Sequence, residues 1–323
     1  MDRRRLLVAG IAAAVGWRSA TAAPRANARV GYLELVKASD GEVLYREFVE
    51  GMRGYGYVEG GNLRLMRRSA EGQPERLRPL AAEMAAAKVD VILAASLEAA
   101  RSAKVAAPQI ATVFVASGDP ILEGLVTSLS RPNGNLTGIV TRDEQLAAKR
   151  LQLLKEAFPR LRSVAVVGSN LAVSRAAFDD AARRFQLDVL LFPVHRQDDY
   201  RDAAAAIARS SADAVLVVED ADALASLSVF VQLMMATRRP VMFNADRFVE
   251  SDVGGLMAYG VSLREVYRRA AHFTARLLEG GKPADLPVEL PTRYELVINA
   301  RAVDVYSIAL PREFLLRADR VIR

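Results

Sequence analysis

The chain has 323 residues, of which 51% are apolar, 25% are charged and 7% are aromatic, and it contains no cysteine. This composition is typical of a globular protein and excludes disordered, collagen-like and disulfide-stapled chains. Without cysteine there are no disulfides, thiolate nucleophiles, zinc fingers, iron–sulfur clusters or lipid-modified N-terminal cysteines. The chain has only two histidines, His195 and His272, which excludes a histidine-rich metal site. At about 100 to 200 residues per domain, the length predicts two domains, each with its own core.

The first two dozen residues have the features of an export signal. Three arginines, Arg3 to Arg5, precede an apolar run from Leu6 to Trp17, and the A-x-A pattern of signal peptidase sites follows at residues 20–22. The apolar run has 12 residues. Crossing a bilayer takes about 20, so we expect an export signal and not an anchor. The arginine pair followed by leucines resembles a twin-arginine signal, although a Sec signal can also begin with basic residues. We place the cleavage after Ala22, because Pro24 fits poorly at the first mature position.

Cleavage at this point also changes the charge of the protein. It removes Arg3 to Arg5, Arg18 and the acidic Asp2, which lowers the formal net charge from +6 to +3. The arginines between residues 64 and 78 alternate with glutamates and apolar residues, which indicates a solvated helix face and not a nucleic-acid patch. No later segment is long and apolar enough to cross a membrane. We therefore expect a periplasmic mature protein that neither inserts into a membrane nor binds nucleic acid.

From residue 28 onward, short apolar β-branched runs alternate with longer amphipathic stretches. This alternation is typical of strand–helix–strand units on a parallel sheet. The predicted strands form two sets of five, namely Arg29–Leu33, Leu63–Arg67, Val89–Ala94, Ala111–Val115 and Leu136–Val140, and then Ser163–Val167, Leu187–Phe192, Ala214–Val218, Pro240–Phe243 and Gly255–Ala258. A helix is predicted over Lys149–Phe158, at the opening of the second set. We therefore predict an α/β fold with two doubly wound, Rossmann-like lobes.

Small polar or acidic residues follow several of the predicted strands. They are Ser96, Asp119 before Pro120, Asn170 after Ser169, the pair Glu219-Asp220, Asn244 and Asp246. Side chains of these types cap helix N-termini, which is one interpretation of each position. Ligands of open α/β sheets bind outside the carboxyl ends of the strands, where these helix N-termini converge. The same residue can therefore cap a helix and line a pocket.

The sequence lacks the motifs of common catalytic sites. It has no G-x-x-x-x-G-K-S/T phosphate loop, no H-E-x-x-H, no G-x-S-x-G elbow and no S-x-x-K arrangement. Five glycines between residues 51 and 61 superficially resemble a dinucleotide loop, but they follow a helix (Val43–Met52) and precede a strand, so helix termination and a tight turn explain them better. His272 is interpreted as structural and His195 as a surface residue. No nucleophile–base–orienter set can be assembled, and we expect no enzyme, no cofactor and no metal site.

Seven segments carry a resemblance to a known family. They are GYVEGGN at 56–62, GDP at 118–120, LVTSLSRPNGNLTG at 125–138, AKRLQLL at 148–154, GLMAYG at 255–260, KPADLPV at 282–288 and PTRYELVIN at 291–299. With these motifs in order, the chain from about residue 28 onward resembles the ABC-transporter substrate-binding proteins of the family that includes tryptophan- and tyrosine-type binders. The resemblance implies a type I periplasmic-binding-protein fold, in which two lobes joined by three crossing segments close on a ligand.

The same resemblance implies that each lobe is discontinuous in sequence. The implied lobes are residues 23–140 plus 262–292, and residues 141–261 plus 293–323. The crossing segments would lie near Val140, Val261 and Thr292. The sequence departs from the family pattern at residues 34–37, where Glu-Leu-Val-Lys replaces a loop rich in glycine, serine or threonine, and at residues 96–98, where Ser-Leu-Glu replaces small residues. Both departures are at pocket-facing positions, so the resemblance alone is not a safe basis for assigning the ligand of the family to this chain.

We expect a periplasmic receptor that captures a small molecule and delivers it to an ABC permease of the inner membrane. The alternative is a ligand-sensing protein that acts on a membrane sensor. Permease and ATPase genes next to the gene would indicate transport, whereas a sensor kinase gene would indicate sensing. A third hypothesis is an exported enzyme with Asp119, Glu219 or Asp220 as acid or base. A cytoplasmic repressor is disfavoured, because residues 1–27 contain no helix-turn-helix. The candidate acids for permease contact, each also explained as part of a solvated helix face, are Glu47, Glu50, Asp179 and Asp180.

The expected ligand is a small polar or zwitterionic molecule, such as an amino acid or related carboxylate with an apolar or aromatic body. Its carboxylate would be held at the helix starts near Ser96 and Ser117, where the helix dipole favours negative charge. An ammonium group needs a desolvated acid, for which the candidates are Asp119, Glu219 and Asp220. The other candidates are Tyr32 and Tyr259 beside the apolar body, and Asn170, Asn244 and Asp246 from the second lobe. Helix capping and core packing are the alternative roles of these residues.

Overall fold

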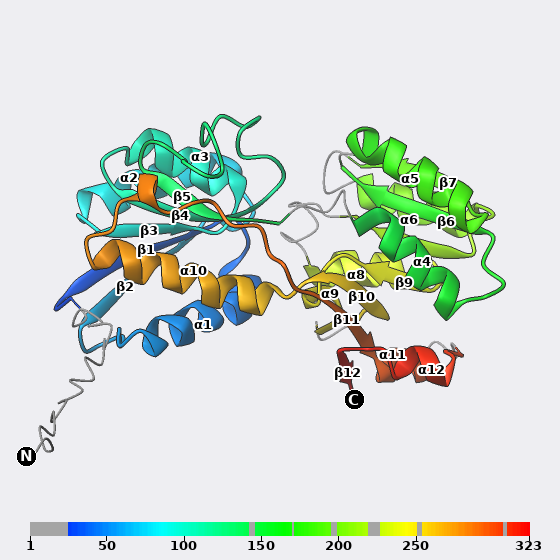
Figure 1. The fold of residues 1–323 in the computed structure, drawn as a ribbon. Coiled ribbons are helices and arrows are strands. Elements are labelled where there is room, and N and C mark those ends of the chain that lie inside the picture. Colours follow the sequence, from blue (N-terminus) through cyan, green and yellow to red (C-terminus); the bar gives the residue numbers. More distant parts are fainter. Residues whose placement is uncertain are drawn as a thin grey trace, which may run out of the picture.

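The computed structural model describes residues 25–141, 146–169, 171–194, 199–218, 227–250, 254–305 and 309–323. In this part of the chain, strands and helices alternate along the sequence, and the strands form two separate sheets. Figure 1 shows the two sheets in two lobes that lie side by side. The predicted α/β fold with two Rossmann-like lobes is confirmed.

The first lobe is built on five strands that all run parallel, in the order β2-β1-β3-β4-β5. These strands are β1 (Ala28–Glu34), β2 (Leu63–Ser69), β3 (Val91–Ala94), β4 (Ala111–Ser117) and β5 (Leu136–Thr141). One face is covered by α2 (Leu77–Ala86) and α3 (Leu97–Ala106), and the other by α1 (Ala38–Gly54) and α10 (Leu263–Leu278) (Figure 1). Because the strands are parallel, their carboxyl ends meet at one edge of the sheet.

Each face of this sheet has its own apolar core, because successive strand residues point to opposite sides. Leu33 and Phe114 belong to the core under α2 and α3, whereas Tyr32 and Val113 belong to the core under α1 and α10. All four side chains are almost completely buried. Burial on both faces explains why these strands appear in the sequence as continuous apolar runs.

The second lobe is built on seven strands in the order β12-β11-β10-β9-β8-β6-β7. They are β6 (Ser163–Gly168), β7 (Asp188–Pro193), β8 (Ala214–Val217), β9 (Val241–Phe243), β10 (Met257–Val261), β11 (Tyr294–Asn299) and β12 (Arg320–Ile322). The main helices are α4 (Ala147–Ala157), α5 (Leu171–Phe185), α6 (Asp199–Arg209) and α8 (Leu227–Ala236). The short helices are α9 (Arg247–Glu250), α11 (Ala300–Val305) and α12 (Arg312–Leu315). Neighbouring strands pair in parallel, except β10 and β11, which are antiparallel.

The prediction of five strands for the second lobe is wrong by two, since β11 and β12 extend the sheet. Strand β12 has only three residues, all at least partly exposed, so it lacks the apolar run that marks a buried strand. The helix predicted from Lys149 begins earlier, at Ala147, because the buried Ala147 adds to its apolar face. No helix in the described ranges has both the length and the apolar character needed to cross a bilayer.

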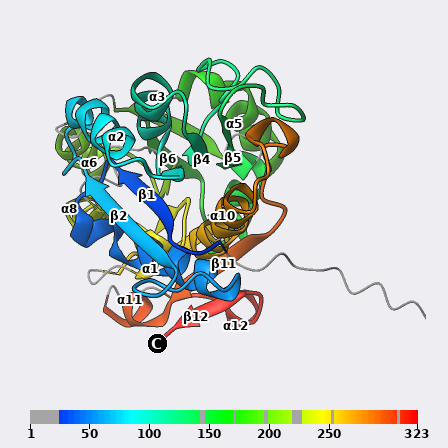
Figure 2. The same cartoon turned by 90° about the vertical axis from the view of Figure 1, so that its left-hand side faces the viewer.

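The chain passes between the lobes three times. It leaves the first sheet after β5, returns from β10 directly into α10, and enters the second sheet again at β11 (Figure 1). Two short 3₁₀ helices, η1 (Pro74–Arg76) and η3 (Pro283–Asp285), lie outside the sheets. Figure 2 shows β12, α11 and α12 together at the lower end of the molecule, on the side of α1. The second lobe is therefore completed by the last part of the chain.

Helix α10 begins directly after the second crossing and packs closely against α1 (Figures 1 and 2). Gly51 allows this close contact, since a Cβ atom there would lie 2.7 Å from the Cβ of Ala271 and 3.1 Å from the Cα of Arg268. Helix α1 continues to Gly54, two residues beyond the predicted end at Met52, and so ends within the glycine cluster as predicted. Gly56, with a φ of 80°, does lie in the predicted tight turn.

Ion pairs connect α10 both to α1 and to the second lobe. The carboxylate of Glu47, which is 8% exposed, accepts hydrogen bonds from Arg264 Nη1 and Arg268 Nε, both at 2.6 Å. Arg264 also pairs with Glu250 of α9 at 2.8 Å. Glu47 is thus buried in an interface, which corrects its interpretation as an exposed docking acid. The other three candidate acids each pair with an arginine on their own helix.

Replacing Gly138 with alanine is expected to destabilise the first lobe. Gly138 pairs with Phe114 across β4 and β5, and a Cβ atom at this position would lie 2.1 Å from the backbone oxygen of Phe114. Because backbone cannot move aside as a flexible side chain can, we expect a loss of about 1 to 3 kcal/mol in the free energy of unfolding, measured by urea denaturation. The control is Gly54→Ala in α1, whose Cβ meets nothing within 4 Å. Equal stability of the two variants would contradict the close approach of β4 and β5.

Candidate ligand-binding site

A cavity of about 70 Å³ opens at the carboxyl ends of the strands of the first lobe. Residues at or just after the ends of β1, β3, β4 and β5 line it, together with parts of α1 and α10. Among the described residues that line it, Arg247, in α9, is the one that does not lie on or next to a helix or strand of the first lobe. This is the edge at which open α/β sheets bind ligands. The cavity therefore lies where the two lobes meet.

Glu34, the last residue of β1, places a carboxylate in this cavity. It is 1% exposed, and its Oε1 accepts a hydrogen bond from Arg67 Nε of the neighbouring strand β2 at 2.6 Å. Its Oε2 is buried and has no hydrogen-bond partner among the described residues. Burial raises the pKa of Glu34 to about 7, although the hydrogen bond and the charge of Arg67 act in the opposite direction. The site thus holds a carboxylate of which one oxygen is engaged and the other is not.

Arg67 is itself held in a fixed position. Its Nη1 pairs with Glu42 at 2.6 Å, and its Nη2 donates a hydrogen bond to the carbonyl oxygen of Ala38 at 2.7 Å. Its guanidinium also lies over the ring of Tyr45, 4.3 Å from the ring centroid. With each part of the guanidinium in contact with a different group, Arg67 fixes the orientation of the Glu34 carboxylate.

Gly41 in the first turn of α1 provides the space for this carboxylate. A Cβ atom at Gly41 would lie 2.0 Å from Oε2 of Glu34 and 3.0 Å from Nη2 of Arg67. A glycine inside a helix costs about 1 kcal/mol relative to alanine. The position of the carboxylate therefore requires a residue that is unfavourable for the helix.

Arg247 brings the opposite charge to the cavity from the second lobe. It is 8% exposed, and among the described residues its charge interacts with Tyr267, Tyr32, Asp40 and Glu34 without an ion pair within 4.0 Å. Burial lowers the pKa of Arg247, whereas the nearby Tyr267, Tyr32, Asp40 and Glu34 act in the opposite direction. A buried cation without a partner is unfavourable, since desolvation is not compensated by an ion pair. The cavity is therefore suited to a group that carries negative charge.

Three of the residues predicted for the site line the cavity, namely Tyr32, Ser96 and Ser117. Ser96 also caps α3, because its hydroxyl accepts a hydrogen bond from the Ala99 amide at 3.1 Å. The ring of Tyr32 contacts that of Tyr45 edge to face, with centroids 5.0 Å apart. Burial raises the pKa of the Tyr32 hydroxyl well above its usual value, so this phenol remains protonated. A single residue, Ser96, thus caps a helix and lines the pocket.

The other predicted residues of the described part are placed elsewhere. Asp119 accepts hydrogen bonds from the next turn of its loop, at 2.8 Å from the Ile121 amide. Asn244 and Asp246 are buried after β9, where Asp246 pairs with Arg320 at 3.3 Å. The ring of Tyr259 lies 6.3 Å from that of Tyr294. None of these residues lines the cavity. The predicted residues that lie outside the described ranges are Asn170, His195, Glu219 and Asp220.

The two charged residues of the cavity were not among the predicted site residues. Glu34 had a signal in the sequence, since it begins the segment that departs from the family pattern after the first strand. Arg247 directly follows the predicted Asp246, but nothing in the local pattern distinguishes its side chain from that of a surface arginine. Tyr267 and Thr141 also line the cavity. Tyr267 lies on α10, which follows the second lobe in sequence and packs in the first.

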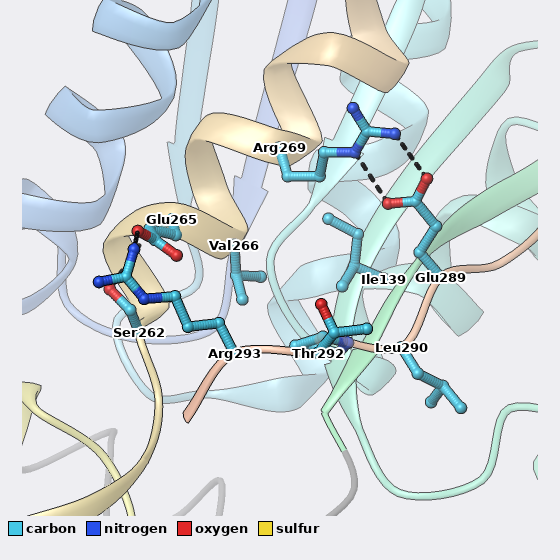
Figure 3. A pocket seen from close by; sticks show the side chains of 10 residues that line it. Ile139, Ser262, Glu265, Val266, Arg269, Glu289, Leu290, Thr292 and Arg293 are labelled. Carbon is cyan, nitrogen blue, oxygen red and sulfur yellow. Dashed lines mark hydrogen bonds and ion pairs between the residues drawn. The ribbon is translucent and has the colours of Figure 1, made fainter. Parts of the chain in front are cut away.

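A second and larger cavity, of about 500 Å³, lies at the segments that connect the lobes. Figure 3 shows its charged side chains in pairs: Arg269 donates two hydrogen bonds to Glu289, at 2.6 and 2.8 Å, and Arg293 pairs with Glu265 at 2.9 Å. Its charges therefore compensate one another. The smaller cavity, in which Arg247 and one oxygen of Glu34 lack partners, is the better candidate for a ligand site. The described ranges contain no group of three or more histidine, aspartate or glutamate side chains that could hold a metal ion.

The raised pKa of Glu34 predicts a pH dependence of stability. Between pH 4.5 and 7 the folded protein holds a proton on Glu34 that the unfolded chain releases, so the stabilisation is complete below pH 4.5 and is lost as the pH rises through 7. We expect the free energy of unfolding to fall by about 1 to 3 kcal/mol from this group alone. Urea denaturation of the protein and of Glu34→Gln between pH 4 and 8 isolates the effect as the difference between the two curves. Parallel curves for the two proteins would show that burial does not raise the pKa of Glu34.

Comparison with known proteins agrees with this arrangement. The family model described as ABC transporter substrate binding protein matches residues 33–322. A tyrosine-binding protein of Clostridioides difficile (strain R20291) is 23% identical over 297 residues, which cover 90% of this chain and 85% of the relative.

Solved structures with the same fold cover nearly the whole chain. The ABC domain in complex with L-Trp from Streptococcus pneumonia has a TM-score of 0.77 at 23% identity, over 91% of this chain and 100% of that one. The ligand-free, open structure of a substrate binding protein with adhesive properties from Clostridium difficile has a TM-score of 0.65 at 20% identity, over 91% and 99%. A conserved domain protein from Vibrio cholerae has a TM-score of 0.79 at 24% identity, over 91% and 99%. The family match agrees with the expectation of a protein that binds a substrate without converting it. The chain belongs to the family of ABC transporter substrate binding proteins.

Proposed function

We propose that the protein is the periplasmic receptor of an ABC importer, which captures a small molecule between its lobes and delivers it to an inner-membrane permease. The observation that carries this proposal is Arg247, a buried cation of the second lobe without a partner among the described residues, over a cavity of the first lobe. A residue in this position contacts a ligand only when both lobes surround it. The membership in a substrate-binding family supports the same role.

The proposed ligand is an amino acid or a related carboxylate. A carboxylate matches the planar guanidinium of an arginine such as Arg247, because it can accept two parallel hydrogen bonds from it. The hydroxyls of Ser96 and Ser117 lie at the same cavity, and the rings of Tyr32 and Tyr267 provide apolar walls. Among the similar proteins, one is a tyrosine-binding protein and another was solved in complex with L-Trp. These similarities support a ligand of the amino-acid class.

The proposed mechanism is closure of two discontinuous lobes, residues 23–140 plus 262–292 and residues 141–261 plus 293–323. Ligand sites usually measure about 300 to 1,000 Å³. Since the cavity holds about 70 Å³, the lobes must separate to admit a ligand. The three crossings near Val140, Val261 and Thr292 are the proposed hinges.

Closure predicts a change in shape that small-angle scattering can measure. Thermal-shift measurements with the twenty standard amino acids first identify a binding probe, which is then added at saturating concentration. We expect a smaller radius of gyration with the probe than without it, because the lobes move together. A non-binding amino acid at the same concentration is the control. An unchanged radius at saturation would contradict the closure mechanism.

The proposed periplasmic location depends on residues 1–22 acting as an export signal that is cleaved after Ala22. If the route is twin-arginine, replacing Arg3 and Arg4 with lysine is expected to stop export, because that route requires the arginine pair whereas Sec requires only positive charge. Cell fractionation followed by N-terminal sequencing measures both the location and the cleavage site. If the double variant is still exported, the signal is assigned to the Sec route. If both the wild type and the double variant remain in the cytoplasm, the export prediction is contradicted.

A further inference from the structure

We propose that the ligand is a zwitterion whose amine is bound by Glu34 of the first lobe and whose carboxylate is bound by Arg247 of the second. This inference rests on the proposed function, and it assigns each charge of the ligand to one residue. It replaces the assignment of the ammonium to Asp119, Glu219 or Asp220 and of the carboxylate to the helix starts. Two groups of opposite charge, each buried and incompletely paired, face the same cavity from different lobes.

Glu34 presents one free oxygen in a fixed position. Oε1 accepts a hydrogen bond from Arg67 Nε at 2.6 Å. Oε2 occupies the space that is open because Gly41 has no side chain. A buried carboxylate oxygen without a hydrogen bond is costly, and the cost disappears when a donor is supplied. An ammonium group is a charged donor with several N–H bonds, so it satisfies both the charge and the hydrogen-bonding capacity of Oε2.

Arg247 and Glu34 do not satisfy each other. In the described structure they form no ion pair within 4.0 Å, although both line the cavity. The aromatic side chains of Tyr32 and Tyr267 form part of the wall of the same cavity. A molecule that carries both charges can occupy the space between them, and it then links the two lobes through one ion pair on each side.

The charge balance of the cluster favours a zwitterion over an ion of one sign. Glu34, Glu42 and Asp40 contribute three negative charges, and Arg67, Arg46 and Arg247 contribute three positive charges, so the cluster is neutral when all six are ionised. An anion would pair with Arg247 but would also face the buried carboxylate of Glu34. A cation would pair with Glu34 but would be repelled by the positive charge of Arg247. A zwitterion leaves the cluster neutral, and buried sites penalise uncompensated charge strongly.

The test crosses two variants with three forms of one ligand. The probe is the standard amino acid that binds most tightly, used as the free zwitterion, as its amide, which lacks the carboxylate, and as its N-acetyl derivative, which lacks the amine. Calorimetry at pH 8, above the raised pKa of Glu34, measures each affinity for the wild type, Glu34→Gln and Arg247→Gln. Glu83→Gln is the matched control, because Glu83 pairs with Arg68, the neighbour of Arg67 on β2, and does not line the cavity.

We expect each variant to weaken binding of the free amino acid about thirtyfold or more, the typical effect of removing one partner of a buried charge pair. Glu34→Gln should leave the affinity for the N-acetyl form unchanged or increased, and Arg247→Gln should do the same for the amide. The control should bind all three forms as the wild type does. Equal weakening of all three forms in either variant would show a structural role and overturn the assignment. Thermal melting of each variant verifies that it is folded.

A different outcome separates this inference from the proposed function. If no standard amino acid binds, the small molecules released by denaturing protein purified from its native periplasm are identified by mass spectrometry. A ligand without an amine or without a carboxylate overturns the zwitterion assignment and leaves the receptor function intact. The absence of any bound molecule, together with no binding in the screen, overturns both. If Arg247→Gln changes the radius of gyration of the free protein but not its ligand preference, Arg247 acts on the arrangement of the lobes and not on the ligand, which also overturns the assignment.

Discussion

A carboxylate that is almost completely removed from water ends strand β1, and the pairing of Glu34 with Arg67 on the neighbouring β2 makes this position tolerable. Several other features follow from this pair. Gly41 keeps the first turn of α1 clear of the carboxylate, and Glu42 and Tyr45 on the same helix hold Arg67. The pair thus determines both the start of α1 and the charge at the carboxyl edge of the sheet.

The two cavities described above differ in how their charges are arranged. At the connecting segments, the arginines and glutamates form ion pairs with one another, so their charges are compensated without a ligand. In the smaller cavity the two incompletely paired charges come from separate lobes. Charges compensated locally suit a region that changes shape when the lobes move. Charges divided between the lobes suit a site that is completed only when a third group joins them.

The two-lobe α/β architecture could be predicted from the sequence, because buried parallel strands appear as apolar runs that can be recognised locally. It was insufficient for β12, which is three partly exposed residues held by pairing with β11. The rule that ligands bind at the carboxyl ends of strands identified Ser96, Ser117 and Tyr32 as residues of one edge. Arg247 could not be found in this way, because its place at the cavity depends on how one lobe sits against the other. Glu34 was visible as a departure from the family pattern, but its burial depends on Arg67, which is 33 residues away.

The antiparallel pairing of β10 with β11 has a consequence for synthesis on the ribosome. After β10 is made, the 32 residues 262–293 must be translated before β11 can cover its edge. At about 5 to 20 residues per second, this leaves an unpaired strand edge exposed for roughly 2 to 6 seconds. Unpaired edges are templates for aggregation. The nascent chain is therefore prone to aggregation at the edge of β10 for a time that depends on the length of the α10 segment. Chaperones that bind nascent chains would have their largest effect during that time.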